Sequence, residues 1–185
     1  MRTVPALRIR LMGALFVEEI KLSDAEMLAK AMDLARRYYD ERGFQHAEAV
    51  YALLDGKDPH IRVIGLFHDL LEDTECSEKE IESIAGAAGL ASVKMLTFDK
   101  SKPVDESRRK AIIDRNHWAE IGIWQDDLVR YYTYVEDIVN SGDKTAFEVK
   151  RADMLDHLSR KATLNDWLRT KYRPVLSLLK IDEQI

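Results

Sequence analysis

The sequence predicts an all-α fold, and three observations carry this prediction. Residues 23–26 (SDAE) and 77–80 (SEKE) have the capping-box pattern, in which a serine hydroxyl caps the first helical turn and a glutamate reaches back. Behind both boxes, apolar residues recur at intervals of three and four, as on one face of a helix. No run of alternating apolar and polar residues lies between hairpin turns, so we expect no sheet.

Glycine and proline divide the first half of the chain into helices. The first expected helix ends at Gly43 and the second at Gly56, because glycine commonly terminates helices. Asp58 and Pro59 open the third, with aspartate as the cap and proline in the first helical position. The second capping box opens a fourth helix, which should stop around Gly89. The expected spans are 23–43, 44–54, 58–74 and 77–89, then a short helix at 91–98.

The second half of the chain also has a helical pattern. The expected elements are a loop at 99–104 and helices at 105–113, 126–139, 144–158 and 165–179. Residues 118–124 have no clear pattern. No repeat, low-complexity tract or linker divides the chain. We therefore expect one helical-bundle domain over residues 23–185, preceded by an N-terminal extension at 1–22.

Composition excludes several classes of protein. Apolar residues make up 46% of the 185 residues, which is enough for a core and excludes wholesale disorder. The formal net charge of -5 argues against binding to duplex nucleic acid, which needs a basic face, but leaves open a small anionic ligand. A single cysteine, Cys76, rules out an internal disulfide and fits a reducing compartment.

Targeting and membrane signals are weak. Residues 1–20 come nearest to a signal peptide, but Glu18 and Glu19 stand where its cleavage site should be. No apolar run is long enough to cross a bilayer. We therefore expect a cytoplasmic protein with no membrane segment.

One expected helix carries an unusual acidic cluster. His68 and Asp69 are adjacent, and Glu72 and Asp73 follow one turn later, so all four lie on neighbouring strips of one helical surface. Three carboxylates this close repel one another unless a cation lies among them, and the apolar residues around them indicate burial. The hypothesis is a metal site, and the alternative is a solvated acidic helix end.

Two further residues are candidates for the same site. His46 lies on the preceding helix, which the short turn at 55–58 would bring back beside the acidic cluster. Asp153 interrupts the apolar stripe of a later helix and therefore needs a partner. The alternatives are a core histidine for His46 and a salt bridge to Lys150 or Arg151 for Asp153.

Three separated motifs carry a resemblance to a known family. They are His46, residues 67–74 (FHDLLEDT) and residues 149–153 (VKRAD), and they resemble the H…HD…D signature of the HD superfamily of metal-dependent phosphohydrolases. The HDLLEDT form is similar to the hydrolase domain of the RelA/SpoT alarmone enzymes and their small stand-alone relatives. The resemblance covers about residues 25 to 180 and implies an all-α bundle of the HD-domain type.

The resemblance implies roles for individual residues. Four positions match the family's metal ligands: His46, His68, Asp69 and Asp153. The implied ion is manganese, although two imidazoles and two carboxylates also suit zinc or iron. Glu72 and Asp73 match the pair that positions or deprotonates the attacking water.

The substrate side of such a site needs positive charge. Lys150, one turn before Asp153, and Lys100 are candidates to neutralise phosphates. For the basic run at 108–110 (RRK), a solvated helix face is the preferred interpretation.

Three departures from the family pattern bear on the substrate. Alarmone hydrolases have a longer loop before the first histidine, rich in Arg, Lys and Gly, whereas residues 39–45 are short here and only Arg42 remains as a candidate nucleotide contact. The family's His-Asn after the last Ala-Asp is replaced by Asp156 and His157, so the usual pocket asparagine is absent. Residues 104–127 are an expected insertion, interpreted as a lid, a binding surface or an aromatic packing patch.

Together these features imply a metal-dependent phosphohydrolase that cuts a phosphate or pyrophosphate ester of a nucleotide. A guanosine tetraphosphate-type alarmone is the leading substrate. The alternatives are the same chemistry on another nucleotide, such as a monophosphate or a modified triphosphate, and a regulatory module that binds metal or nucleotide without cleavage. The expected partner is a small-molecule nucleotide, and a homo-oligomer is compatible with the sequence.

Overall fold

The computed structural model describes residues 22–118 and 125–182, and all regular structure in that part of the chain is helical. The helices are α1 (Asp24–Tyr38), α2 (Glu41–Leu53), α3 (Pro59–Phe67), α4 (Leu70–Asp73), α5 (Glu78–Leu96), α6 (Glu106–Arg115), α7 (Asp126–Asn140), α8 (Lys144–Ser159) and α9 (Asp166–Leu176). The all-α prediction is therefore confirmed. Among the described helices, none combines the length and the apolar character that a bilayer crossing requires. All but one residue of the expected N-terminal extension, 1–22, lies outside the described residues.

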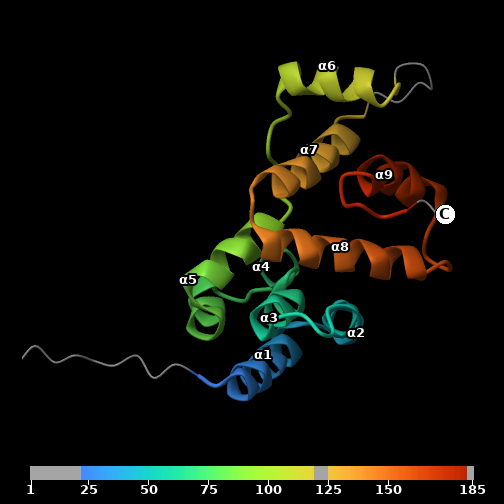
Figure 1. Cartoon of the computed structure of the whole chain (residues 1–185). Coiled ribbons are helices and arrows are strands. Elements are labelled where there is room, and N and C mark those ends of the chain that lie inside the picture. The colour runs from blue at the N-terminus through green and yellow to red at the C-terminus, as the bar shows by residue number, and fades with distance from the viewer. Residues whose placement is uncertain (1–21, 119–124, 183–185) are drawn as a thin grey trace, which may run out of the picture.

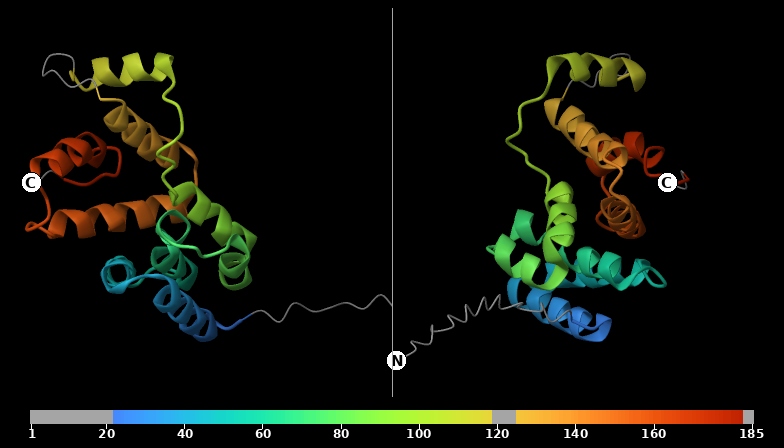
Figure 2. Two further views of the ribbon diagram at one scale, coloured as in Figure 1. Left: turned by 180° about the vertical axis from the view of Figure 1, so that it is seen from behind. Right: turned by 60° about the vertical axis from the view of Figure 1, so that its left-hand side comes forward.

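The helices pack in two layers on either side of α8 (Figure 1). α1, α2 and α3 lie on one side with α5 beside them, and α7, α9 and α6 lie on the other, as both views in Figure 2 also show. α8 belongs to both layers, because Val149 and Ala152 pack into one apolar cluster and Met154 into the other. Residues on α8 can therefore face groups from either layer.

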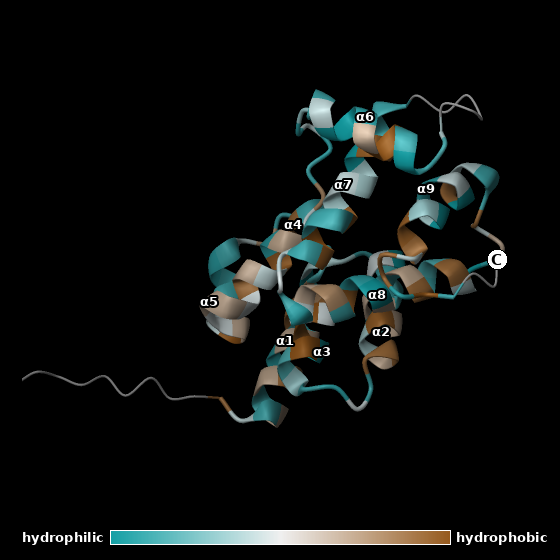
Figure 3. Cartoon of the chain, turned by 45° about the horizontal axis from the view of Figure 1, so that its top comes forward, coloured by the Kyte–Doolittle hydropathy of each residue, from teal (hydrophilic) through white to brown (hydrophobic). Residues whose placement is uncertain are grey.

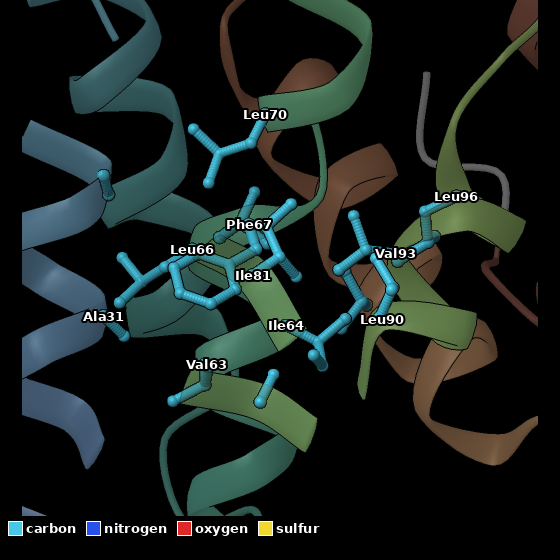
Figure 4. Packing of buried hydrophobic residues seen from close by; sticks show 14 of the residues in the cluster. Ala31, Val63, Ile64, Leu66, Phe67, Leu70, Ile81, Leu90, Val93 and Leu96 are labelled. Carbon is cyan, nitrogen blue, oxygen red and sulfur yellow. The ribbon is translucent and has the colours of Figure 1, made fainter. Parts of the chain in front are cut away.

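The first apolar cluster surrounds α3. Five consecutive residues at the C-terminal end of this helix are buried, from Val63 to Phe67. Figure 4 shows their side chains meeting those of α5, with Ile64 beside Leu90. Because a fully buried side chain of this size contributes about 1.5–3 kcal/mol, the end of α3 is held firmly in place.

The second cluster contains more aromatic rings. Trp118 packs edge-on against Tyr132 of α7, with ring centroids 6.2 Å apart. α6 is largely polar (teal in Figure 3) and buries only Ile112 and Ile113. The described part of the expected insertion, 104–127, thus packs against α7, in line with the packing-patch interpretation. Trp124 lies outside the described residues.

Ion pairs attach α6 to α7. Arg108 donates hydrogen bonds of 2.8 Å to both Glu136 and Asp137, and Arg109 lies 2.9 Å from Asp126. The solvated-face interpretation of residues 108–110 is therefore wrong for these two arginines, since they face acidic residues of α7.

Two glycines do not end helices as expected. Gly43 lies inside α2, because Asp40 caps that helix by accepting a 2.7 Å hydrogen bond from the Gly43 N–H. The break expected around Gly89 lies instead at Gly86, whose φ of 69° is a left-handed conformation that favours glycine. Gly89 allows close packing, since a Cβ there would lie 3.1 Å from Ile64 Cδ1.

Candidate metal centre

The single helix expected over 58–74 is interrupted at the His-Asp motif. In an unbroken helix the Asp69 N–H would donate to the Gly65 carbonyl. Here that carbonyl accepts from His68 Nδ1 at 2.8 Å, and the Asp69 N–H donates to the Tyr39 hydroxyl at 3.2 Å. The acidic cluster therefore does not lie on one helical surface, because side-chain hydrogen bonds replace a rung of the helix between α3 and α4.

His46 faces His68 from α2, and their Nε2 atoms lie 3.1 Å apart. Gly65 permits this close approach of α2 and α3, since a Cβ there would lie 2.6 Å from Leu54 Cδ1. His46 Nδ1 is 2.7 Å from a carboxylate oxygen of Asp156. Each imidazole thus uses Nδ1 to hold the ring and turns Nε2 toward the other, which is how metal-binding histidines are oriented.

Two carboxylates complete the group. His68 Nε2 lies 3.1 Å from Asp69 Oδ2 and 4.0 Å from Asp153 Oδ1. His46 Nε2 lies 3.6 and 3.3 Å from the same two oxygens. Ligands about 2.1 Å from one ion are about 3 Å apart when adjacent and about 4.2 Å apart when opposite. The spacing of the two imidazoles from each other and from each carboxylate thus suits one ion, while the role of the four side chains as ligands stays a prediction.

The surroundings of the Asp153 carboxylate indicate whether these residues suit a cation. Its side chain is only 4% exposed, and Oδ2 pairs with Lys150 Nζ at 2.7 Å. Oδ1 is buried and accepts no hydrogen bond from any described residue. Leaving such an atom unpartnered costs about 1–3 kcal/mol, and a divalent ion among the four side chains would supply the partner. The alternative salt bridge to Lys150 is also present, but it uses only one of the two oxygens.

The electrostatics of the site favour positive charge. Burial lowers the pKa of His68, but the carboxylates of Asp69 and Asp153 outweigh it and raise that pKa to about 9. Burial would raise the pKa of Asp153, yet the adjacent Lys150 charge holds it well below its usual range. The carboxylates therefore remain ionised beside the imidazoles.

Glu72 and Asp73 lie on α4 at the edge of the group. Glu72 accepts a 3.0 Å hydrogen bond from the Phe98 N–H and pairs with Lys100 at 3.0 Å. The carboxylate of Asp73 is exposed and pairs with no described residue. Partial burial and the carboxylates of Asp69 and Glu72 raise the pKa of Asp73. Of the two acids, Asp73 is the one whose oxygens are available to a water molecule.

Two cavities flank the group and share Asp69, Asp73 and His157. The smaller, about 220 Å³, is lined by the rings of Phe98, Tyr131 and Tyr172 and by Lys100, Lys150 and Lys171. The larger, about 560 Å³, is lined by Tyr38, Tyr39, Arg42 and Arg160. The sequence-predicted cations are thus divided between the two cavities.

These cations differ in how much charge they can offer a ligand. Lys150 is buried and already neutralised by Asp153. Lys100 is 72% exposed and paired with Glu72. Arg42 is exposed and has no partner among the described residues.

The sequence reasoning missed two groups. Lys171 lies 4.2 Å from the Tyr131 ring centroid and has no carboxylate partner among the described residues. Asp156, which orients His46, is itself held by Arg160 at 2.7 Å. The spacing of three and four residues from Asp153 is the signal that would have placed Asp156 and His157 beside it.

No family model matches this sequence, and no curated protein matches it. Among solved structures, the chain is similar to a metazoan ortholog of SpoT that hydrolyses ppGpp, with 20% sequence identity and a TM-score of 0.54. The alignment covers 85% of each chain. At this identity the likeness shows the fold alone, a helical bundle shared with that structure.

Proposed function

We propose that this protein is a metal-dependent phosphohydrolase that cleaves a phosphate or pyrophosphate ester of a nucleotide. The observation that carries the proposal is the convergence of two imidazoles and two carboxylates, from three separate elements, around the unpartnered Asp153 Oδ1. The resemblance implies manganese, and the donor set is also compatible with zinc or iron.

In this proposal, different side chains have different roles in the hydrolysis. A divalent ion held by the two histidines and two aspartates would supply Lewis acidity toward a phosphoryl oxygen and lower the pKa of water. Asp73, with its raised pKa and unpaired oxygens, accepts a proton from the attacking water. Glu72 acts by holding Lys100 and the backbone at Phe98 against the smaller cavity.

Cavity sizes favour one orientation of the substrate. Pockets for drug-sized ligands occupy about 300–1,000 Å³. The 220 Å³ cavity is smaller than this and suits a phosphate group, which Lys171 and Lys100 would neutralise. The 560 Å³ cavity suits a nucleoside, with Tyr39 and Arg42 in its wall. The activity of the SpoT ortholog supports a guanosine polyphosphate as the substrate to test first.

A second candidate is the same reaction on another nucleotide. Arg42 is the only basic side chain in the short segment before His46, and His157 replaces the pocket asparagine. Both differences concern the nucleoside and not the reacting phosphate. A nucleoside monophosphate or a modified triphosphate therefore belongs in the same assay.

The test is release of phosphate or pyrophosphate from a nucleotide panel with Mn²⁺. Wild type should act on at least one member, and Asp69→Ala should reduce turnover to background. Asp33→Ala, an exposed acid of α1, is the matched control and should behave as wild type. Metal binding without cleavage of any member would instead indicate a regulatory module.

A further inference from the structure

His157 is a third imidazole beside the four proposed ligands. It lies one helical turn after Asp153 on α8, and its Nε2 is 3.1 Å from Asp153 Oδ1. The ligand atoms of His46, Asp153 and His157 all lie within 4.8 Å of one another. The four-residue centre does not use this side chain.

The contact between His157 Nε2 and Asp153 Oδ1 places an imidazole nitrogen against a buried carboxylate oxygen. Although the two atoms are 3.1 Å apart, Oδ1 accepts no hydrogen bond from a described residue. An imidazole with its proton on Nδ1 would turn the Nε2 lone pair toward the same space as this carboxylate oxygen. A cation in that space removes their repulsion.

We propose that His157 is a fifth protein ligand of the ion held by His46, His68, Asp69 and Asp153. This inference rests on the metal centre of the proposed function. The distances of 3.1 and 3.3 Å from Asp153 Oδ1 to the Nε2 atoms of His157 and His46 suit adjacent positions around one ion with bonds of about 2.1 Å.

The surroundings of His157 support a ligand role. Its ring stacks on Tyr172 with centroids 5.5 Å apart and an interplanar angle of 28°, which limits its orientation. The side chain is 38% exposed and borders both cavities, so the ring has room for the small adjustment that coordination requires.

A third imidazole would change the choice of metal. Imidazole suits iron, nickel, copper and zinc, whereas manganese prefers oxygen ligands, and affinities generally rise from Mn²⁺ to Co²⁺. His157 should therefore strengthen Co²⁺ binding more than Mn²⁺ binding. Removal of the His157 imidazole should therefore reduce the difference between the Co²⁺ and Mn²⁺ affinities.

The experiment counts imidazoles around Co²⁺ in the full-length protein by X-ray absorption, with affinities measured by calorimetry. His157→Asn keeps a side-chain hydrogen-bond donor but removes the imidazole. We expect imidazole scattering to fall from three rings to two, and Co²⁺ affinity to fall about tenfold or more, with a smaller loss for Mn²⁺. His60→Asn, an exposed histidine of α3, should retain three rings.

Several outcomes separate the hypotheses. If wild type binds one Co²⁺ and His157→Asn has unchanged imidazole scattering, the fifth ligand is overturned and the four-residue centre stands. If wild type binds two ions and the variant one, His157 serves a separate ion and the inference is also overturned. If wild type binds no metal, the proposed function itself fails. His157→Gln, checked for folding by circular dichroism, replaces the Asn variant if the latter is unfolded.

Discussion

The two apolar clusters on either side of α8 are built from different side chains. Among the described buried residues of the first cluster, Phe67 is the only aromatic, and the rest are aliphatic or small. The second cluster contains Trp118, Tyr131, Tyr132 and Tyr172. Aliphatic packing is dense and non-directional, whereas aromatic rings also offer faces and polar tips to ligands.

This difference matches what each layer presents to the site. α2, α3 and α4 bring His46, His68 and Asp69 from the aliphatic layer, where packing fixes their positions. Tyr131 and Tyr172 line the smaller cavity from the aromatic layer. Under the proposed function, the aliphatic layer would hold the metal and the aromatic layer would face the substrate, with Asp153 on the helix that both layers share.

The largest expected effect comes from Asp153→Ala, because it acts on both layers. The variant should lose metal binding and be destabilised by about 3–5 kcal/mol, since Lys150 is left buried without its partner. Metal analysis and denaturant unfolding measure the two losses. The double variant Lys150→Met/Asp153→Ala should recover much of the stability but no metal. Full metal occupancy with an unchanged melting temperature in Asp153→Ala would contradict the assignment.

The next effect separates the two acids of α4. Asp73→Asn should reduce kcat by about 10²–10⁴-fold, the usual contribution of a general base, with metal affinity retained. Glu72→Gln should also bind metal normally and turn over far more slowly than wild type, although less slowly than Asp73→Asn, because it acts through Lys100. Steady-state kinetics and metal titration of both variants give the comparison. Equal loss of metal and turnover in either variant would recast that acid as structural.

A smaller effect is expected where α2 and α3 meet. Gly65→Ala places a Cβ 2.6 Å from Leu54 Cδ1, and overpacking of this kind costs about 1–3 kcal/mol. The helices must move apart, so metal affinity should fall together with stability. Adding Leu54→Ala removes the clash and should restore metal affinity without restoring stability. Unchanged affinity in Gly65→Ala would mean that helix spacing does not set the distance between the imidazoles.

The smallest effect concerns the attachment of α6. Burial would raise the pKa of Glu136, but hydrogen bonds from Arg108 and Arg115 outweigh it and hold that pKa below its usual 4.5. A carboxylate whose folded pKa is lowered stabilises the protein above its unfolded pKa, and this contribution is lost as the pH falls through the folded value. Amide exchange in α6 should therefore rise below about pH 4.5 by less than about tenfold, since exposed ion pairs contribute at most ~1 kcal/mol. Glu136→Gln should show no such rise in α6 as the pH falls below about 4.5, because the variant has no carboxyl group to protonate.

Local signals predicted where most helices begin. Both capping boxes form, and Asp58 caps α3 with Pro59 in its first turn. These signals depend on hydrogen bonds within four residues, so the sequence window contains both partners. The helix end predicted at Gly43 is wrong because a stronger signal, the Asp40 cap, lies three residues before it and starts α2 there.

Long-range contacts explain what the sequence did not predict. The helix breaks at Asp69 because the partner of its N–H is Tyr39, which belongs to another part of the chain. Lys171 joins the smaller cavity through Tyr131, and no spacing pattern relates the two. The four proposed ligands are implied by the family resemblance. The structure adds that their side chains, which are far apart in the sequence, lie close together in the fold.

At the break between α3 and α4, a side chain of the proposed metal centre also shapes the backbone that carries it. The Gly65 carbonyl accepts from His68 Nδ1, whereas the Asp69 N–H donates to the Tyr39 hydroxyl. An aliphatic residue at position 68 would release that carbonyl, and a regular helical turn would then close across the motif. His68 would therefore set the local backbone at the motif in addition to its role in the proposed metal centre.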